Sequence, residues 1–240
     1  MMGLQLSPRS RIILAVVLLL GLILFMPMRI ALGLTGLERV GLAAREVQGT
    51  LWSGRIDQLM LGTVELGPVR AALSPVSLLM GRVRIDLWRR DGVADDLSGA
   101  LTAGFDRIGL DDVTGTVPLG RSFAPLPIGS LAMEDVTAYF SDDRCGHAEG
   151  RVHAQISGQF PGLNLSQGLS GAVGCDGDAL LMPLVSQSGL EKINLRIWRS
   201  GRYVADMRVE TGDAALAGAL AKVGFADVGG ARVLKVEGTL

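Results

Sequence analysis

Apolar and polar side chains alternate along most of this chain, and the alternation predicts a protein built mainly of β-strands. In residues 83–87 and 193–197 the apolar side chains fall at every second position. Successive side chains of a strand point to opposite faces, so one face of these segments is buried and the other meets water. Similar runs bounded by Gly, Asp and Pro predict strands at 47–52, 55–61, 64–73, 81–89, 97–105, 113–119, 129–140, 150–157, 168–175, 179–185, 192–198, 203–210 and 232–238.

The segments between these runs predict how neighbouring strands are connected. Residues 90–92, 176–177 and 200–201 contain Gly next to Asp or Ser, which tolerate the positive φ of tight turns. Neighbouring strands are therefore expected to be antiparallel. The fold class predicted is mostly β: one large, curved antiparallel sheet, either folded over or open and barrel-like.

Two short apolar segments predict helices instead of strands. Ser74 and Pro75 precede 76–80 as a cap residue and a first-turn proline, and Asp213 precedes 214–223, which ends before a glycine. Both helices are apolar, and we expect both to pack on the sheet.

The N-terminal part differs from the rest. Residues 12–28 carry no charged or hydrogen-bonding side chain and would span about 25 Å as a helix, and 30–34 can extend it. A cleaved signal peptide is disfavoured, because its core is usually shorter and no A-x-A-like site follows. Arg9 and Arg11 precede the run and should stay in the cytoplasm. The sequence thus predicts a cytoplasmic tail and transmembrane anchor at 1–34, and a domain outside the cytoplasm at 35–240.

Charge and cysteine usage narrow the partners and the compartment. The formal net charge is −1, without the basic excess that nucleic-acid binding requires, so no nucleic-acid partner is expected. Cys145 and Cys175 both lie in the predicted exported part, where an oxidising compartment permits a disulfide. We expect them to join neighbouring parts of one sheet.

Residues that could carry catalysis or bind metal do not form a recognisable site. Adjacent carboxylates in a strand point to opposite faces, and in a turn they are solvated. His147 and His153 near Cys145 lack the usual zinc-ligand spacing. We therefore predict no enzyme, catalytic residue, cofactor or metal. The carboxylate pairs considered are Asp95–Asp96, Asp111–Asp112 and Asp142–Asp143.

Two segments after the apolar run form the most distinctive pattern of the chain. The first, 49–55, reads Gly-Thr-Leu-Trp-Ser-Gly-Arg, and the second, 73–82, reads Leu-Ser-Pro-Val-Ser-Leu-Leu-Met-Gly-Arg. With an N-terminal anchor before them and two cysteines after them, they resemble the type II secretion system protein N family over nearly the whole chain. The residues that carry the resemblance are Gly49, Thr50, Trp52, Gly54, Arg55, Leu73, Pro75, Leu78, Leu79, Gly81 and Arg82.

The resemblance implies a single-pass protein of the bacterial inner membrane with its β-rich domain in the periplasm. Its partners would be other type II secretion subunits, and it would support export of folded proteins by binding and assembly. The family also looks related to AsmA-like periplasmic proteins, whose folded sheets present an apolar trough to lipid. A lipid-binding or lipid-transport module, with phospholipid as a ligand, is therefore the alternative function.

The role of three motif residues stays open between structure and function. Trp52 suits either a core or sheet-edge position, which we favour, or contact with a partner. Gly49 and Gly54 flank it and predict a bend or bulge. Arg55 and Arg82 could contact lipid phosphate, although solvated strand ends are the simpler interpretation.

Overall fold

A computed structural model describes residues 8–30, 42–61, 64–89, 96–120, 122–157, 163 and 165–240. Three expectations fall elsewhere in the chain: the helical extension over 31–34, the turn at 90–92, and the position of Asp95. They lie outside the described residues.

One antiparallel sheet of fifteen strands dominates the described chain, in the order β1-β2-β3-β4-β5-β6-β7-β8-β9-β11-β12-β13-β15-β14, with β10 paired to β11. Most strands thus pair with the strand before them in the sequence, which confirms the mostly β, antiparallel prediction. The strands are β1 Leu42–Thr50, β2 Ser53–Leu61, β3 Val64–Leu73, β4 Val83–Arg89, β5 Leu97–Ala103, β6 Arg107–Pro118, β7 Ile128–Ser141, β8 Arg144–Ile156, β9 Leu169–Ala172, β10 Gly174–Asp176, β11 Ala179–Ser186, β12 Glu191–Ile197, β13 Arg202–Glu210, β14 Ala226–Val228 and β15 Ala231–Thr239.

The longest strands begin earlier than the sequence predicts. β6 starts at Arg107 and β8 at Arg144 instead of 113 and 150. Both added pieces are rich in Gly and charged residues, and register shifts interrupt the pairing of β6 and β7 between Leu110 and Val113. The sequence also misses β14, whose three residues are all exposed and give no buried face.

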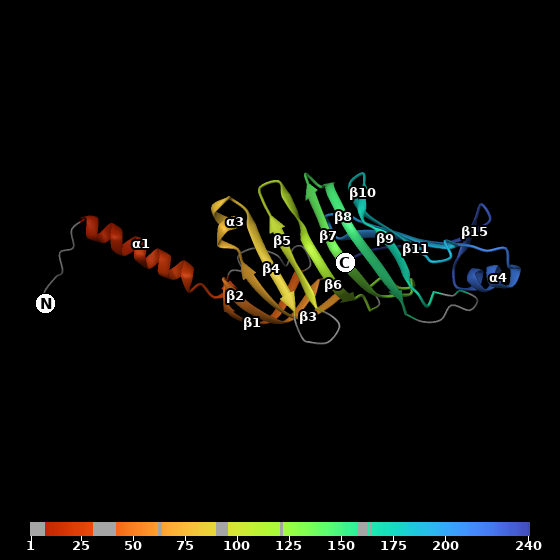
Figure 1. Ribbon diagram of the computed structural model, residues 1–240, viewed down its shortest axis with the longest axis horizontal. Helices are drawn as coiled ribbons and strands as arrows, with labels where there is room; N and C mark the ends of the chain where they lie inside the picture. Colours follow the sequence, from red (N-terminus) through yellow and green to blue (C-terminus); the bar gives the residue numbers. More distant parts are fainter. Residues whose placement is uncertain are drawn as a thin grey trace.

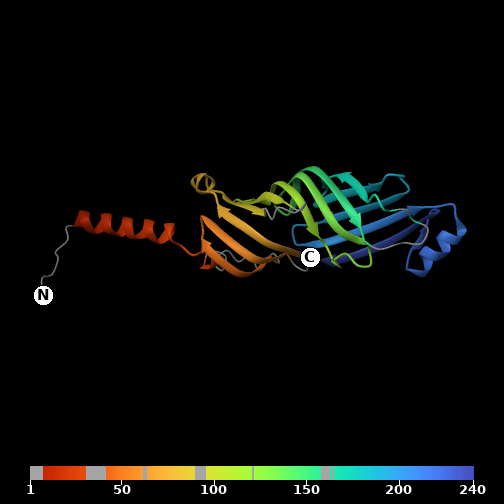
Figure 2. The same ribbon diagram turned by 60° about the horizontal axis from the view of Figure 1, so that its bottom comes forward.

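The sheet curves along its length, so that its second half lies close to its first (Figures 1 and 2). The Tyr203 hydroxyl on β13 donates to the Ser122 carbonyl at 2.8 Å, and the Tyr203 ring contacts Phe123 edge to face at 4.7 Å between centroids. One continuous cluster of buried apolar side chains extends from Met28 to Leu234. The concave side is therefore a packed core.

Outside the sheet lie the helices α1 Pro8–Leu24, α3 Pro75–Leu79 and α4 Ala214–Lys222. In Figure 1, α1 extends away from the end of the sheet that carries α3, and α4 lies at the opposite end. None of the helices in the described residues has both the length and the apolar character needed to cross a membrane.

The two short helices meet the sheet differently. α4 buries Leu220 to 2% exposure, as expected. α3 buries no residue, and Leu79 is 90% exposed. The expectation that α3 packs on the sheet is therefore wrong, because its helical residues project from the end of the sheet instead of covering its apolar face.

Candidate functional site

The segment 49–55 forms the hairpin between β1 and β2, with Leu51 and Trp52 in the turn. Gly49 has a φ of +92°, and a Cβ there would lie 2.5 Å from the Ser53 carbonyl oxygen, so only glycine fits. A Cβ on Gly54 would lie 2.0 Å from the Met28 sulfur. The hairpin is therefore shaped to receive the residues that follow α1.

Backbone hydrogen bonds connect the end of α1, the hairpin and the start of α3. The Leu51 amide donates to the Met26 carbonyl at 3.0 Å, and the Leu73 amide donates to the Leu51 carbonyl at 3.1 Å. Pro27 forms an isolated bridge with Thr50, and Met28 is buried to 3% exposure. We call this arrangement the hairpin junction; it brings together two motif segments that are separated in the sequence.

The second motif segment, 73–82, turns the chain from β3 into β4 through α3. Pro75 occupies the first turn of α3, where its missing amide costs no hydrogen bond. Gly81 has a φ of +73°, a left-handed conformation that favours glycine, and the Arg82 amide donates to the Ser77 carbonyl at 2.9 Å. Leu78 is partly exposed, while Leu79 and Arg82 are exposed.

Trp52 and Arg55 differ in exposure on the hairpin. Trp52 is half-buried in the turn, and Arg55 on β2 pairs with Asp57 at 2.6 Å. The Arg55 guanidinium therefore has a carboxylate neighbour on its own strand and lies at the surface.

A disulfide joins Cys145 on β8 to Cys175 on β10, with their Cα atoms 5.5 Å apart. The turn directly before β8 contains Asp142 and Asp143, and both residues have positive φ. Asp143 reaches Arg199, which follows β12, at 2.9 Å. The disulfide and this ion pair both tie the middle of the sheet to its second half.

A polar cluster crosses strands β4, β6 and β7. Asp111 accepts from the Tyr139 hydroxyl at 2.6 Å and pairs with Arg84, which also pairs with Asp86 at 2.9 Å. Partial burial, and then the bond to Asp111, raise the pKa of Tyr139 to about 12. The Arg84 pKa is raised chiefly by its bond to Asp86. Each group is paired, which is typical of a structural network.

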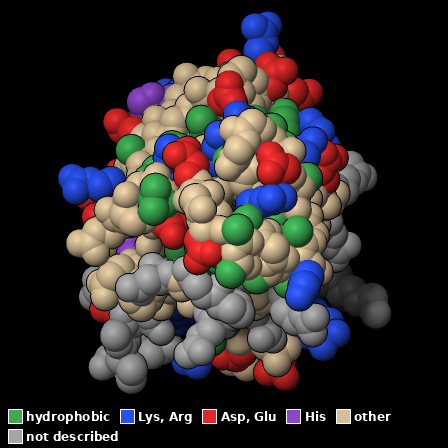
Figure 3. All heavy atoms as spheres, turned by 90° about the vertical axis from the view of Figure 1, so that its right-hand side faces the viewer, with side chains coloured by type: hydrophobic (Ala, Val, Ile, Leu, Met, Phe, Trp, Pro, Cys, Tyr) green, Lys and Arg blue, Asp and Glu red, His purple; other side chains and the backbone are tan. Residues whose placement is uncertain are grey.

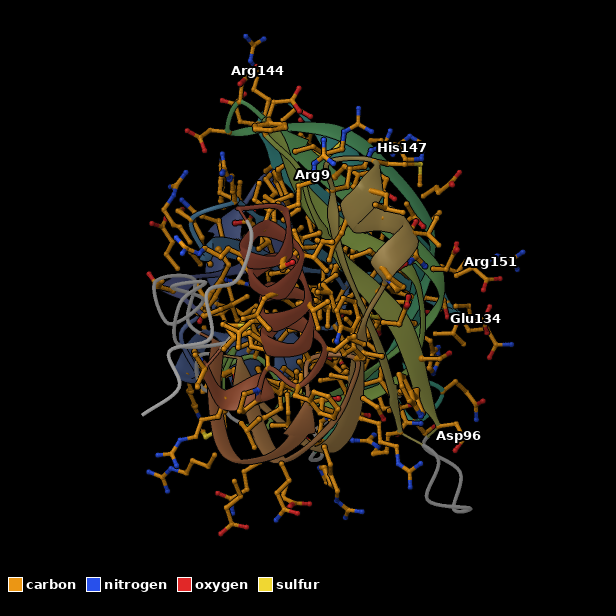
Figure 4. The ribbon with its side chains drawn as sticks, turned by 90° about the vertical axis from the view of Figure 1, so that its left-hand side faces the viewer. Arg9, Asp96, Glu134, Arg144, His147 and Arg151 are labelled. Carbon is orange, nitrogen blue, oxygen red and sulfur yellow. A yellow bond between two sulfur atoms is a disulfide. The ribbon has the colours of Figure 1, made fainter. Side chains whose placement is uncertain are left out.

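The histidines do not converge with the cysteines or the carboxylate pairs. His147 projects from the outer face of the sheet together with Glu134 and Arg151 (Figure 4) and lies 3.4 Å from Glu149. His153 bonds to the Ser170 hydroxyl at 2.8 Å. Among the residues that the structure describes, no group of three His, Cys, Asp or Glu could hold a metal ion.

Sequence reasoning identified the two motif segments but missed the residues that join them. Met26, Pro27 and Met28 belong to the apolar run and gave no sign of contact with the domain. Leu51 acts through its backbone, so its side chain carries no signal. The available clue was the pair Gly49 and Gly54, whose missing side chains indicate a close approach of another chain segment.

Comparison with known proteins agrees with the family that the sequence resembles. Residues 40–235 match the sequence model described as "Type II secretion system (T2SS), protein N". The "Type II secretion system protein N" of Vibrio cholerae serotype O1 (strain ATCC 39315 / El Tor Inaba N16961) is 27% identical over 161 residues, which cover 62% of this chain and 64% of that protein. The match thus spans less than two thirds of the relative. No solved structure matches. The chain belongs to the type II secretion system protein N family.

Proposed function

We propose that this protein is a non-enzymatic accessory component of a bacterial type II secretion system, acting by binding and assembly. The observation that carries the proposal is that the hairpin of segment 49–55 holds the segment directly after the apolar helix. This hairpin thereby attaches the domain to its N-terminal segment, and its described residues contain no cluster of reactive side chains. Other secretion subunits would be its partners.

The N-terminal apolar segment would anchor the protein in the inner membrane. Along α1 the apolar side chains are exposed, including Ile12, Leu18 and Leu22, so the domain does not provide their cover. Transfer of such a helix from water into the hydrocarbon of a membrane lowers its free energy. Arg9 and Arg11 would hold the N-terminus in the cytoplasm and place the sheet in the periplasm. The Cys145–Cys175 disulfide supports an oxidising compartment for the domain.

Secretion by the host provides the first test. Deleting the protein should reduce secretion of folded type II cargo, and the wild-type chain should restore it. The full-length protein, cross-linked in cells, should capture other known secretion subunits, detected by immunoblot. Normal secretion without the protein, together with no captured subunit, would contradict the assembly role.

Topology is tested separately with a reporter fused after Leu240, which should be active only outside the cytoplasm. N-terminal sequencing of the mature protein should show a start before residue 12, because an anchor would not be cleaved. Activity in the cytoplasm would reverse the orientation without affecting the assembly role.

The lipid-transport alternative needs an apolar surface inside the sheet that is open to an acyl chain. Interior side chains such as Leu169, Ile193 and Met207 are instead fully buried against one another. A lipid would have to displace them. For this reason the assembly role comes first, and bound phospholipid in native mass spectra would reverse the order.

A further inference from the structure

Five apolar side chains form an exposed surface at the end of the sheet that carries α3. Leu79 is 90% exposed and Phe105, in the turn between β5 and β6, is completely exposed. The turn after α3 approaches Phe105, since a Cβ on Gly81 would lie 3.8 Å from the Phe105 ring. We call this surface the apolar rim; it consists of Val76, Leu79, Met80, Val83 and Phe105.

The apolar rim serves no packing role within the described domain. α3 contributes no buried residue, and a five-residue helix has little stability of its own. An alternating strand needs no apolar residue at a turn, yet Phe105 stands between Gly104 and Asp106 there. Contiguous exposed apolar side chains of this kind mark a contact surface.

The position of the apolar rim relative to α1 indicates what covers it. The Met26 carbonyl, two residues after α1 ends, bonds to Leu51, and Leu51 bonds to Leu73, two residues before α3 begins. The hairpin between β1 and β2 therefore lies directly at the end of the apolar helix. Figures 1 and 2 show α1 leaving from the same end of the molecule that carries α3.

Charges at the border of the apolar rim fit a membrane surface. Arg82 follows α3 and Arg107 begins β6, and both are exposed; Asp106 between Phe105 and Arg107 is the opposing charge. Arginine side chains beside an apolar surface can keep their guanidinium groups at the level of lipid phosphates while the neighbouring side chains enter the acyl boundary.

We propose that the apolar rim inserts into the periplasmic surface of the same bilayer that holds α1, and so fixes the orientation of the sheet on the membrane. This inference rests on the proposed anchoring of α1. The ligand is the bilayer itself: Leu79, Met80 and Phe105 enter the interfacial layer, and Arg82 and Arg107 contact lipid phosphate. α1 and the apolar rim then form two points of attachment, which prevent the domain from tilting freely.

The test uses full-length protein in vesicles of phosphatidylethanolamine and phosphatidylglycerol. Single cysteines at Leu79→Cys or Phe105→Cys are labelled with an environment-sensitive fluorophore under non-reducing conditions, so the Cys145–Cys175 disulfide does not react. Labels at 79 and 105 should shift to the blue and be quenched by lipids that carry a shallow spin label. Val228→Cys, exposed on β14 at the other end of the molecule, should remain open to aqueous iodide.

Failure of the rim and failure of the anchor give different results. A label at Leu18→Cys in α1 reports on the anchor through lipids that carry a deep spin label. Quenching at 18 with water-exposed labels at 79 and 105 overturns the rim proposal and leaves the anchor intact. Labels at 79 and 105 that become shielded only when another secretion subunit is added also overturn it, in favour of a protein partner.

A second substitution confirms that the contact depends on the surface as a whole. Leu79→Asp, introduced into the protein labelled at 105, should reduce lipid quenching at 105, because a charge within the apolar rim opposes its entry into the interface. Val228→Asp should leave the quenching unchanged. Equal quenching in both variants would overturn the proposal. Far-UV circular dichroism of each variant verifies that the sheet is retained.

Discussion

The two short helices of the domain have nearly the same chemical character but opposite relations to the sheet. α4 contains only Ala, Leu and Gly before its final Lys222, and it buries Leu220 in the core. α3 contains Pro, Val, Ser and Leu, and it buries nothing. α4 lies at the end opposite to α1, where apolar side chains are interspersed with charged ones (Figure 3). α3 lies at the end where α1 leaves the domain.

The difference shows that an apolar composition indicates that a helix is buried against some surface, but it does not tell which surface that is. The 9-residue α4 finds it in the sheet, and its Asp213 cap bonds to two amides of the first turn. The five-residue α3 is too short to reach back over the apolar face. Exposed apolar residues in such a place fit the proposed contact with a surface outside the domain.

The largest expected difference between the two helices is in how much a substitution in each one lowers the stability of the protein. Leu220→Ala should lower the free energy of unfolding by about 2–5 kcal/mol, because it leaves a cavity in the core. Leu79→Ala should change it by less than about 0.5 kcal/mol, because that side chain is exposed. Chemical denaturation of the full chain in detergent measures both. A large loss for Leu79→Ala would mean that α3 is covered by the domain in solution.

Substitutions in the hairpin junction, at the α3 end of the sheet, should cause the second-largest loss of stability. Gly54→Val would place side-chain atoms on the Met28 sulfur and should destabilise the protein by about 1–3 kcal/mol. Gly174→Val is the matched control, because a Cβ there meets no atom within 4 Å. Limited proteolysis after residue 24 should accelerate in Gly54→Val alone. Equal cleavage of the two variants would show that the junction does not hold the segment.

Capping gives a smaller contrast between the helices. Asp213 accepts from the Ala215 amide at 2.7 Å, so Asp213→Ala should cost about 1 kcal/mol. Ser74 makes no side-chain cap bond and only accepts from the Ser77 hydroxyl at 3.2 Å, so Ser74→Ala should cost less than Asp213→Ala. The same denaturation experiment detects this difference. Equal costs would assign α3 a cap that contributes to stability and weaken the contrast.

The smallest expected effect on stability at neutral pH concerns Tyr139, which lies between the α3 end and the α4 end of the sheet. Its pKa is raised to about 12 from 10.0, so the folded protein holds the phenolic proton more tightly than the unfolded chain. The resulting stabilisation is present below pH 10 and is lost between about pH 10 and 12. Tyrosinate absorbance should show this titration, Tyr139→Phe should remove it, and Asp111→Asn should lower the pKa. An unchanged pKa in Asp111→Asn would exclude the Asp111 carboxylate as a cause.

The fold was predictable wherever apolar and polar side chains alternate along a strand, even in β4, where Ile85 and Leu87 are only partly buried. The alternation in 83–87 and 193–197 locates β4 and β12, and β3 has the predicted limits. Residues 107–112 of β6 include Gly109 and two aspartates, which resemble a turn, although they pair with β7 across a bulge. β14 is exposed throughout and relies on pairing with β15, and backbone pairing leaves no pattern in the side chains.

The candidate site was predictable only in part. The glycines and the tryptophan of segment 49–55 could be recognised from the sequence, because glycine at a left-handed or crowded position leaves a residue-type signature. The bonds from Met26 to Leu51 and from Leu51 to Leu73 use backbone atoms, which every residue possesses. The exposure of Leu79 and Phe105 depends on the position of α3 relative to the sheet. That position is a property of the tertiary structure and leaves no local pattern in the sequence.

The nearly sequential strand order has a consequence for the way the protein is made. Because β2 through β8 each pair with the preceding strand, most of the sheet's hydrogen bonds form between residues close in sequence. The short loops that connect such neighbouring strands close quickly and at low entropic cost. The sheet can therefore grow strand by strand while the rest of the chain is still emerging. The contact of Tyr203 with Ser122, which closes the curve, becomes possible only when nearly the whole sheet is present.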